Sequence, residues 1–223
     1  MKFIILGLCF SLSAVAQGTL KSPNISGNAL FLYRNANSAK EDNSTKRNGI
    51  DLQEAELAFY ADVDPYSRLN ILLAVAPKYT EDLTTGKVTQ KFEVVPEELF
   101  AETNQVPLTT LRVGIFKAAF GKHNLLQAHA TPFVDAPLGN TAFFDDGLSD
   151  PGISAALLLP TGWFSEFTAQ YFRGEGENKS FNSRSPNDAV GLGHWKNLAD
   201  ISDALTVELG ASYAQGVNSL GGN

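Results

Sequence analysis

Between Glu54 and Asp64 the chain reads Glu-Ala-Glu-Leu-Ala-Phe-Tyr-Ala-Asp-Val-Asp, an alternation that decides the fold class. The odd positions are all apolar, whereas most of the even positions are polar or acidic. Side chains of a β-strand point alternately to its two faces, so this period of two predicts a strand with one apolar and one polar face. The stretch is longer than the ~5–6 residues of an ordinary strand and close to the ~9–11 of a tilted strand that crosses a bilayer.

Residues 205–213 repeat the alternation, with small and acidic side chains such as Glu208 sharing one face. Seven further strands are predicted from weaker alternation and from the turn residues that flank them. They cover residues 25–34, 68–76, 92–102, 111–117, 152–159, 164–172 and 189–196. The sequence therefore predicts an all-β protein with about nine antiparallel strands.

The connections between the predicted strands alternate in length. Those at 64–67, 103–110, 160–163 and 197–204 are comparatively short, whereas those at 36–49, 77–91, 118–150 and 173–188 are long and polar. Barrels of the bacterial outer membrane show this asymmetry because their periplasmic turns are tight and their extracellular loops are large. A soluble β-sandwich is the alternative, but nothing in its packing forces short and long loops to alternate. We therefore expect an up-and-down transmembrane β-barrel.

The first sixteen residues have the pattern of a secretory signal peptide. Lys2 supplies a positive charge, residues 3–10 form a short apolar run, and Ala14-Val15-Ala16 is a small-residue cleavage site. The apolar run is far shorter than the ~20 residues of a transmembrane helix. We expect export to the outer membrane, cleavage after Ala16, and one barrel unit over residues 17–223. Cleavage would also remove Cys9, the chain's one cysteine.

Charge and motifs exclude several classes of protein. A formal net charge of -7 with no basic stripe argues against nucleic acid as a partner. The sequence contains neither the Gly-x-Ser-x-Gly elbow of hydrolases nor a phosphate-binding Walker loop. Asp145 and Asp146 are adjacent, so in an extended segment they point apart and do not form the carboxylate pair of a glycosidase. We expect no enzymatic activity and no cofactor.

Several segments between residues 92 and 216 resemble a known group of proteins. The most specific are Gly121-Lys122-His123-Asn124, His129-Ala130 and Pro132-Phe133-Val134-Asp135. Together with the alternating strands, they resemble Gram-negative outer-membrane porins of the phosphate-selective-porin-like type over about half of the chain. The resemblance implies a barrel of roughly twice this strand number, often a homotrimer, that passes small hydrophilic or anionic solutes through a membrane of lipid and lipopolysaccharide.

Strand number and the final residues add a further expectation. Single-chain bacterial barrels have an even number of strands, whereas the predicted number is odd. Residues 219–223, Ser-Leu-Gly-Gly-Asn, have the composition of a loop. We therefore expect the chain to be the amino-terminal portion of a larger, even-numbered barrel.

The long connection at 118–150 is the predicted constriction of the channel. A constriction needs apolar side chains that pack on the barrel wall and charged side chains that face the water. The connection offers both: Phe120, Phe133, Phe143 and Phe144 beside Lys122, His123, His129, Asp135, Asp145 and Asp146. An ordinary solvated surface loop is the alternative reading.

Further candidate pore-lining residues lie on the predicted strands, namely Glu54, Glu56, Glu98, Arg112 and Lys117. A basic ladder formed by Arg112, Lys117 and Lys122 beside the acidic residues would set up a transverse field across the channel. The alternative is that a channel wall is polar simply because it faces water. The net acidity of the chain argues mildly against a strong preference for anions.

His123 and His129 are six residues apart and, with Asp135, raise the question of a metal site. Their spacing matches none of the usual zinc sites, so we expect no metal. The sequence thus predicts an outer-membrane porin that allows diffusion of small hydrophilic solutes or ions. The alternative function is a binding or adhesion barrel that acts through its long extracellular loops.

Overall fold

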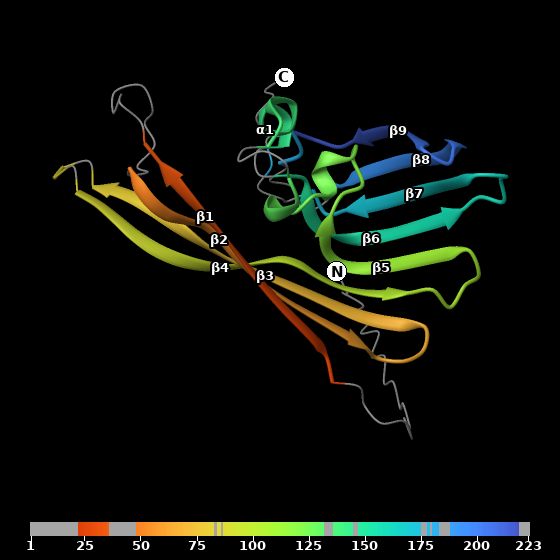
Figure 1. Ribbon diagram of the computed structural model, residues 1–223, viewed down its shortest axis with the longest axis horizontal. Coiled ribbons are helices and arrows are strands. Elements are labelled where there is room, and N and C mark those ends of the chain that lie inside the picture. The colour runs from red at the N-terminus through yellow and green to blue at the C-terminus, as the bar shows by residue number, and fades with distance from the viewer. Residues whose placement is uncertain are drawn as a thin grey trace, which may run out of the picture.

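The structure is a computed structural model that describes residues 22–35, 48–82, 84–85, 87–131, 136–144, 147–174, 178, 180–182 and 188–218. These residues form one antiparallel sheet of nine strands, in which each strand pairs with its neighbours in the sequence (Figure 1). The strands are β1 (Asn24–Arg34), β2 (Gly49–Asp62), β3 (Ser67–Asp82), β4 (Lys87–Thr103), β5 (Thr109–Lys117), β6 (Ser149–Leu158), β7 (Phe164–Phe172), β8 (Val190–Ser202) and β9 (Leu205–Gln215). The predicted all-β antiparallel fold of about nine strands is confirmed.

The prediction of a long loop at 77–91 is wrong. β3 continues to Asp82 and β4 begins at Lys87, so a short turn joins them. Thr80 pairs with Thr89 across this hairpin, and Lys78 Nζ donates to Glu93 Oε2 at 3.1 Å. The segment is polar, but backbone pairing forms a strand whatever the polarity of its side chains. Short and long connections therefore do not strictly alternate along the chain. The β3–β4 hairpin reaches to the far left of Figure 1.

A β-bulge in β4 changes the direction of its acidic side chains. The register between β3 and β4 shifts where Leu72 pairs with Glu98 and Leu73 pairs with Pro96, which leaves Glu97 as the extra residue. The ladder is interrupted there, so it accommodates a proline that lacks an N–H. In a regular strand Glu97 and Glu98 would point to opposite faces. Here both contact Lys117.

One face of the sheet, which we call the outer face, is apolar and uncovered. Cross-strand pairs join Val113 to Ile153 and Ile153 to Tyr171, and each of these side chains is 57% exposed. Residues of the outer face on other strands include Leu57, Leu73, Val94, Leu99, Leu157, Phe167, Trp195, Leu209 and Tyr213. The alternation of each strand therefore yields one continuous apolar surface.

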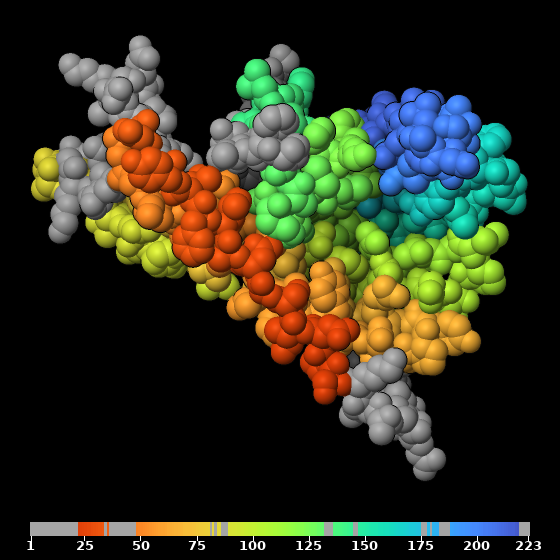
Figure 2. All heavy atoms as spheres, in the orientation of Figure 1, coloured from red at the N-terminus to blue at the C-terminus, as the bar shows by residue number. Residues whose placement is uncertain are grey.

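The opposite face, which we call the inner face, is partly covered by the described residues of 118–148, which we call the inner segment. This segment contains the short helices η1 (His123–Leu125), η2 (Ala128–Ala130) and α1 (Leu138–Phe144). In the space-filling view its green atoms lie between the orange atoms of the first strands and the blue atoms of the last ones (Figure 2).

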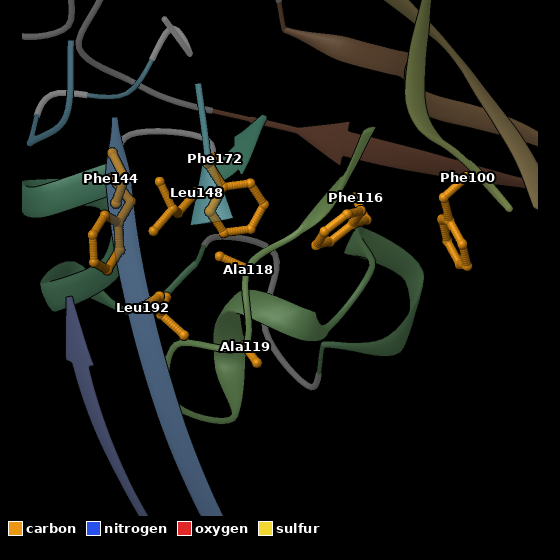
Figure 3. Packing of buried hydrophobic residues seen from close by; sticks show 9 residues of the cluster. Phe100, Phe116, Ala118, Ala119, Phe144, Leu148, Phe172 and Leu192 are labelled. Carbon is orange, nitrogen blue, oxygen red and sulfur yellow. The ribbon is translucent and has the colours of Figure 1, made fainter. Parts of the chain in front are cut away.

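The hydrophobic core lies between the inner segment and strands β4 to β8 (Figure 3). The ring centroids of Phe116 and Phe172 are 5.1 Å apart, and those of Phe100 and Phe116 are 6.1 Å apart. From the inner segment, Ala118, Phe144 and Leu148 belong to the same buried cluster. Burial of one such ring stabilises the packing by about 1.5–3 kcal/mol, so the core fixes the segment on the sheet. In the described part of the chain, none of the helices is long and apolar enough to cross a membrane.

Candidate functional site

Three glutamates form an acidic group on the inner face. Glu54 and Glu56 come from β2 and Glu97 from the bulge of β4, and one carboxylate oxygen of each lies within 4.8 Å of the other two. Glu56 is buried; its Oε2 accepts a hydrogen bond from Asn28 Nδ2 at 3.0 Å and lies 2.8 Å from His129 Nδ1. Within the described residues, a second buried oxygen of this carboxylate has no hydrogen-bond partner. Like charges this close repel one another, so the group attracts positive charge.

Lys117 connects the acidic group to the inner segment. Its Nζ lies 3.6 Å from Glu97 Oε2, and its backbone N–H donates to Glu98 Oε1 at 3.5 Å. The same ammonium donates to Leu126 O at 3.4 Å and to the side-chain oxygen of Gln127. One largely buried lysine thus holds β4, β5 and the inner segment together.

Two arginines share one acid, Glu102, farther along β4. Arg112 Nε lies 2.6 Å from Glu102 Oε2, and Arg68 Nε lies 3.8 Å from Glu102 Oε1. The Arg112 guanidinium also lies 5.1 Å from the centroid of the Phe100 ring, a distance at which a cation is attracted to an aromatic face. The bases of β5 are therefore paired with acids of β4.

The predicted ladder of three bases is not observed as a single row. Arg112 and Lys117 both lie on β5, but Lys122 Nζ bonds Glu208 Oε2 on β9 at 2.8 Å. Lys196 approaches the other oxygen of Glu208 at 3.8 Å. The difference arises because the inner segment turns away from β5 and crosses the sheet before Lys122 is placed. The inner face therefore has separate charged groups near β4 and β9.

The inner segment is anchored on both sides of the inner face. His129 in η2 bonds Glu56 on β2, while Gly121 N donates to Ser212 Oγ on β9 at 2.9 Å. Ser212 Oγ also lies 2.7 Å from His194 Nδ1 of β8. The segment therefore spans from the second strand to the last one, next to the charged groups.

A pocket of about 440 Å³ opens where the inner segment meets β9. Its walls include the rings of Phe120, Phe143, Phe144 and Phe181. The Phe120 and Phe144 rings pack edge to face with centroids 5.0 Å apart. The surface beside the charged groups is thus partly apolar.

The structure brings some of the predicted site residues together and separates others. Glu54, Glu56, Lys117 and His129 meet around the acidic group, with Glu98 in contact with Lys117. His123 is exposed in η1. Among the described residues, it does not belong to the group of side chains that could hold a metal ion, which is Glu54, Glu56 and Glu97. Three predicted residues lie outside the described residues, namely Asp135, Asp145 and Asp146.

Sequence reasoning missed three residues of this site. Glu97 joins the acidic group through a bulge, and the proline before two consecutive acids was the available signal. Glu208 was assigned to a polar face, but its role as the partner of Lys122 depends on the path of a distant segment. Asn124, whose side chain ties the ends of the inner segment together, ends the Gly121-Lys122-His123-Asn124 segment of the porin resemblance, but the sequence assigned it no role.

Comparisons with known proteins add little about activity. No family model matches the chain, and no solved structure matches it. It is similar to an uncharacterized protein of Aquifex aeolicus (strain VF5), with 28% identity over 198 residues. The similarity covers 83% of this chain and 39% of that protein, so the chain spans about two fifths of the relative's length. The chemical contrast between the two faces of the sheet is therefore the main indication of function.

Proposed function

We propose that this chain forms part of an outer-membrane channel of the porin kind, through which small hydrophilic solutes or ions diffuse. The observation that carries the proposal is the contrast between the two faces of the sheet. Outer-face side chains such as Val113, Ile153 and Tyr171 are apolar and more than half exposed, whereas the inner face carries charged groups. A continuous apolar surface of this kind is unfavourable in water but favourable against lipid.

The edges of the sheet support a larger barrel. Among the described residues, β1 and β9 each pair with one strand and not with each other. Unpaired backbone groups cost several kcal/mol each in lipid, so a membrane sheet has to close. Bacterial barrels have an even number of strands, and the similar Aquifex aeolicus protein is considerably longer than this chain. We therefore infer that further strands complete an even-numbered barrel, and the porin resemblance adds a homotrimer to the proposal.

The site of action in this proposal is the inner segment, which acts as the constriction. It covers part of the inner face and brings Lys122 and His129 to the lumen wall beside Glu208 and Glu56. Charged side chains at a narrow point select among solutes by charge. The remaining parts of the proposal rest on the sequence pattern alone: export by residues 1–16, an outer-membrane location, and contact with lipid and lipopolysaccharide.

Planar-bilayer recording of the full-length gene product tests the proposal. We expect stepwise conductance, and a larger step when residues 120–146 are replaced by a short Gly-Ser linker. The matched control shortens the β3–β4 hairpin beyond Lys78 by removing the same number of residues from both strands. This hairpin lies away from the inner face, so the control should leave the conductance step unchanged. A folded, inserted protein that passes no ions would overturn the proposal.

A binding or adhesion barrel is the second candidate, and one observation favours it. The β3–β4 hairpin, whose strands have 16 and 17 residues, projects beyond its neighbours in Figure 1 and offers a polar surface to a partner. A strain that lacks the gene distinguishes the two functions. Normal solute uptake with lost surface binding supports adhesion, whereas slower uptake supports the channel.

A further inference from the structure

The inner segment leaves and rejoins the sheet at one buried neck. Ala118 N donates to Leu148 O at 2.8 Å, and these two residues are 0% and 1% exposed. Ala119 N donates to Gln170 Oε1 on the inner face of β7 at 2.7 Å. Both ends of the segment are therefore fixed at one point on the sheet, close to the hydrophobic core.

A single side chain, that of Asn124, ties the two ends of the neck together. Its Nδ2 donates to Ala118 O at 2.7 Å and to Leu148 O at 3.0 Å, while its Oδ1 accepts from Leu148 N at 2.7 Å. An amide group is suited to this position because it carries two donors and an acceptor together. Asn124 is 4% exposed, so water does not replace these bonds when the side chain is changed.

Two of the polar contacts farther along the segment are made by more exposed side chains. The Lys122 side chain is 66% exposed and that of His129 is 44% exposed. The Lys122–Glu208 pair contributes little to stability because water and salt screen an exposed ion pair, whereas the Glu56 partner of His129 is 5% exposed. The buried neck therefore determines the direction in which the segment leaves the sheet, and Lys122 and His129 then meet their partners on β9 and β2.

We propose that Asn124 is the positioning residue of the constriction, which holds the inner segment across the lumen and thereby sets the bore of the channel. This inference rests on the proposed channel function. Asn124 touches no solute and acts through the position of the segment. Its loss loosens the neck and lets the segment shift on the inner face, although the core and Lys117 still hold it, so the bore widens while the barrel strands are unchanged.

The test uses the full-length protein in planar bilayers with Asn124→Asp. The substitution keeps the shape and the acceptor for Leu148 N, but it places carboxylate oxygen against the carbonyls of Ala118 and Leu148. We expect the single-channel conductance to rise above that of the unchanged protein, toward that of the linker variant that lacks residues 120–146. The matched control is Asn104→Asp, at an exposed turn between β4 and β5, which should conduct like the unchanged protein.

A cross-linking arm reads the position of the segment without relying on conductance. In a Cys9→Ser background, Lys122→Cys and Glu208→Cys are bridged by a short bifunctional thiol reagent. We expect a high yield of cross-linked protein when Asn124 is present and a much lower yield in the Asn124→Asp variant. In those Asn124→Asp molecules that do become cross-linked, the conductance should return to the low value of the unchanged protein. A general loss of stability would not be reversed in this way.

The outcomes separate this inference from the proposed function. If the unchanged protein passes no ions, the channel proposal fails, while the cross-linking yield still tests the role of Asn124. If Asn124→Asp lowers thermal stability but leaves both conductance and yield unchanged, Asn124 is merely structural and the inference is overturned. If this variant does not insert, Asn124→Ser repeats the test, because it removes the amide donors without adding a charge.

Discussion

Val113 and Phe116 lie three residues apart on β5, yet one is 57% exposed and the other 1%. Val113 belongs to the outer face, which no described part of the chain covers. Phe116 belongs to the inner face, where the inner segment packs on it. Both are apolar residues on one strand, so their different environments come from what lies against each face. The comparison teaches that the apolar surface of this sheet serves two purposes, packing on the inside and, in our proposal, contact with lipid on the outside.

The largest expected effect is on the inner face. Phe116→Ala removes a fully buried ring that contacts Phe100 and Phe172, and should lower the free energy of unfolding by about 3–5 kcal/mol. Phe143→Ala, at a ring that is 64% exposed, is the control and should cost less than about 0.5 kcal/mol. Urea titration of the protein folded into vesicles measures both. Equal losses would show that the inner segment does not cover this face.

The next effect tests the outer face. Val113→Arg places a charge at mid-strand and should destabilise a lipid-inserted sheet by about 2–4 kcal/mol. Val106→Arg, at a similarly exposed valine in the β4–β5 turn, should cost about 0–1 kcal/mol, because charges are tolerated near the membrane interface. Titration in vesicles compares the two variants. If both variants lowered the free energy of unfolding by the same small amount, the outer face would not contact lipid. The proposed difference in environment between the two faces would then be wrong.

A smaller effect tests backbone packing on the inner face. Gly114 has φ +136°, and an added Cβ would lie 2.1 Å from Leu99 O. Gly114→Ala should therefore cost about 1–3 kcal/mol through strain at this dihedral angle. Gly191, where an added Cβ has no neighbour within 4 Å, is the control. Thermal unfolding of both variants measures the difference, and an unchanged midpoint for Gly114→Ala would show that β5 does not approach β4 this closely.

The smallest effect lies at the tip of the β3–β4 hairpin, beyond both faces. Hydrogen bonds from the backbone N–H groups of Thr84 and Thr85 lower the pKa of Asp82 below its ordinary value of 3.8. A lowered pKa in the folded protein means that the turn is stabilised above the unfolded pKa, and that this stabilisation is lost as the pH falls through the folded pKa. The amide NMR shifts of Thr84 and Thr85 should follow that acidic titration. Asp82→Asn should abolish it, and a titration that survives would assign it to another group.

Much of the fold could be predicted from the sequence because strand alternation is a local property. Each of the predicted strands corresponds to one observed strand, from residues 25–34 in β1 to 205–213 in β9. The hairpin at 77–91 was missed because its residues are polar, and the bulge at Glu97 because one extra residue leaves no mark on hydrophobicity. Errors thus occurred where backbone pairing, and not burial, decides the structure.

The site was less predictable than the fold. Alternation placed Glu54 and Glu56 on one polar face, and the structure agrees. The bonds from His129 to Glu56 and from Lys122 to Glu208 join residues far apart in the sequence. Such contacts depend on the whole path of the inner segment, which begins at a neck that no local pattern indicates.

By itself, the sequence determined that the chain is an antiparallel all-β protein and which side chains share a face, because a period of two fixes both within a few residues. The tertiary structure alone decided which face is covered. It brought Glu97 to Glu54 and Glu56 through a bulge, and it tied Ala118 to Leu148 through Asn124. These features depend on register and loop closure, which join distant residues and are set by the packing of the complete sheet.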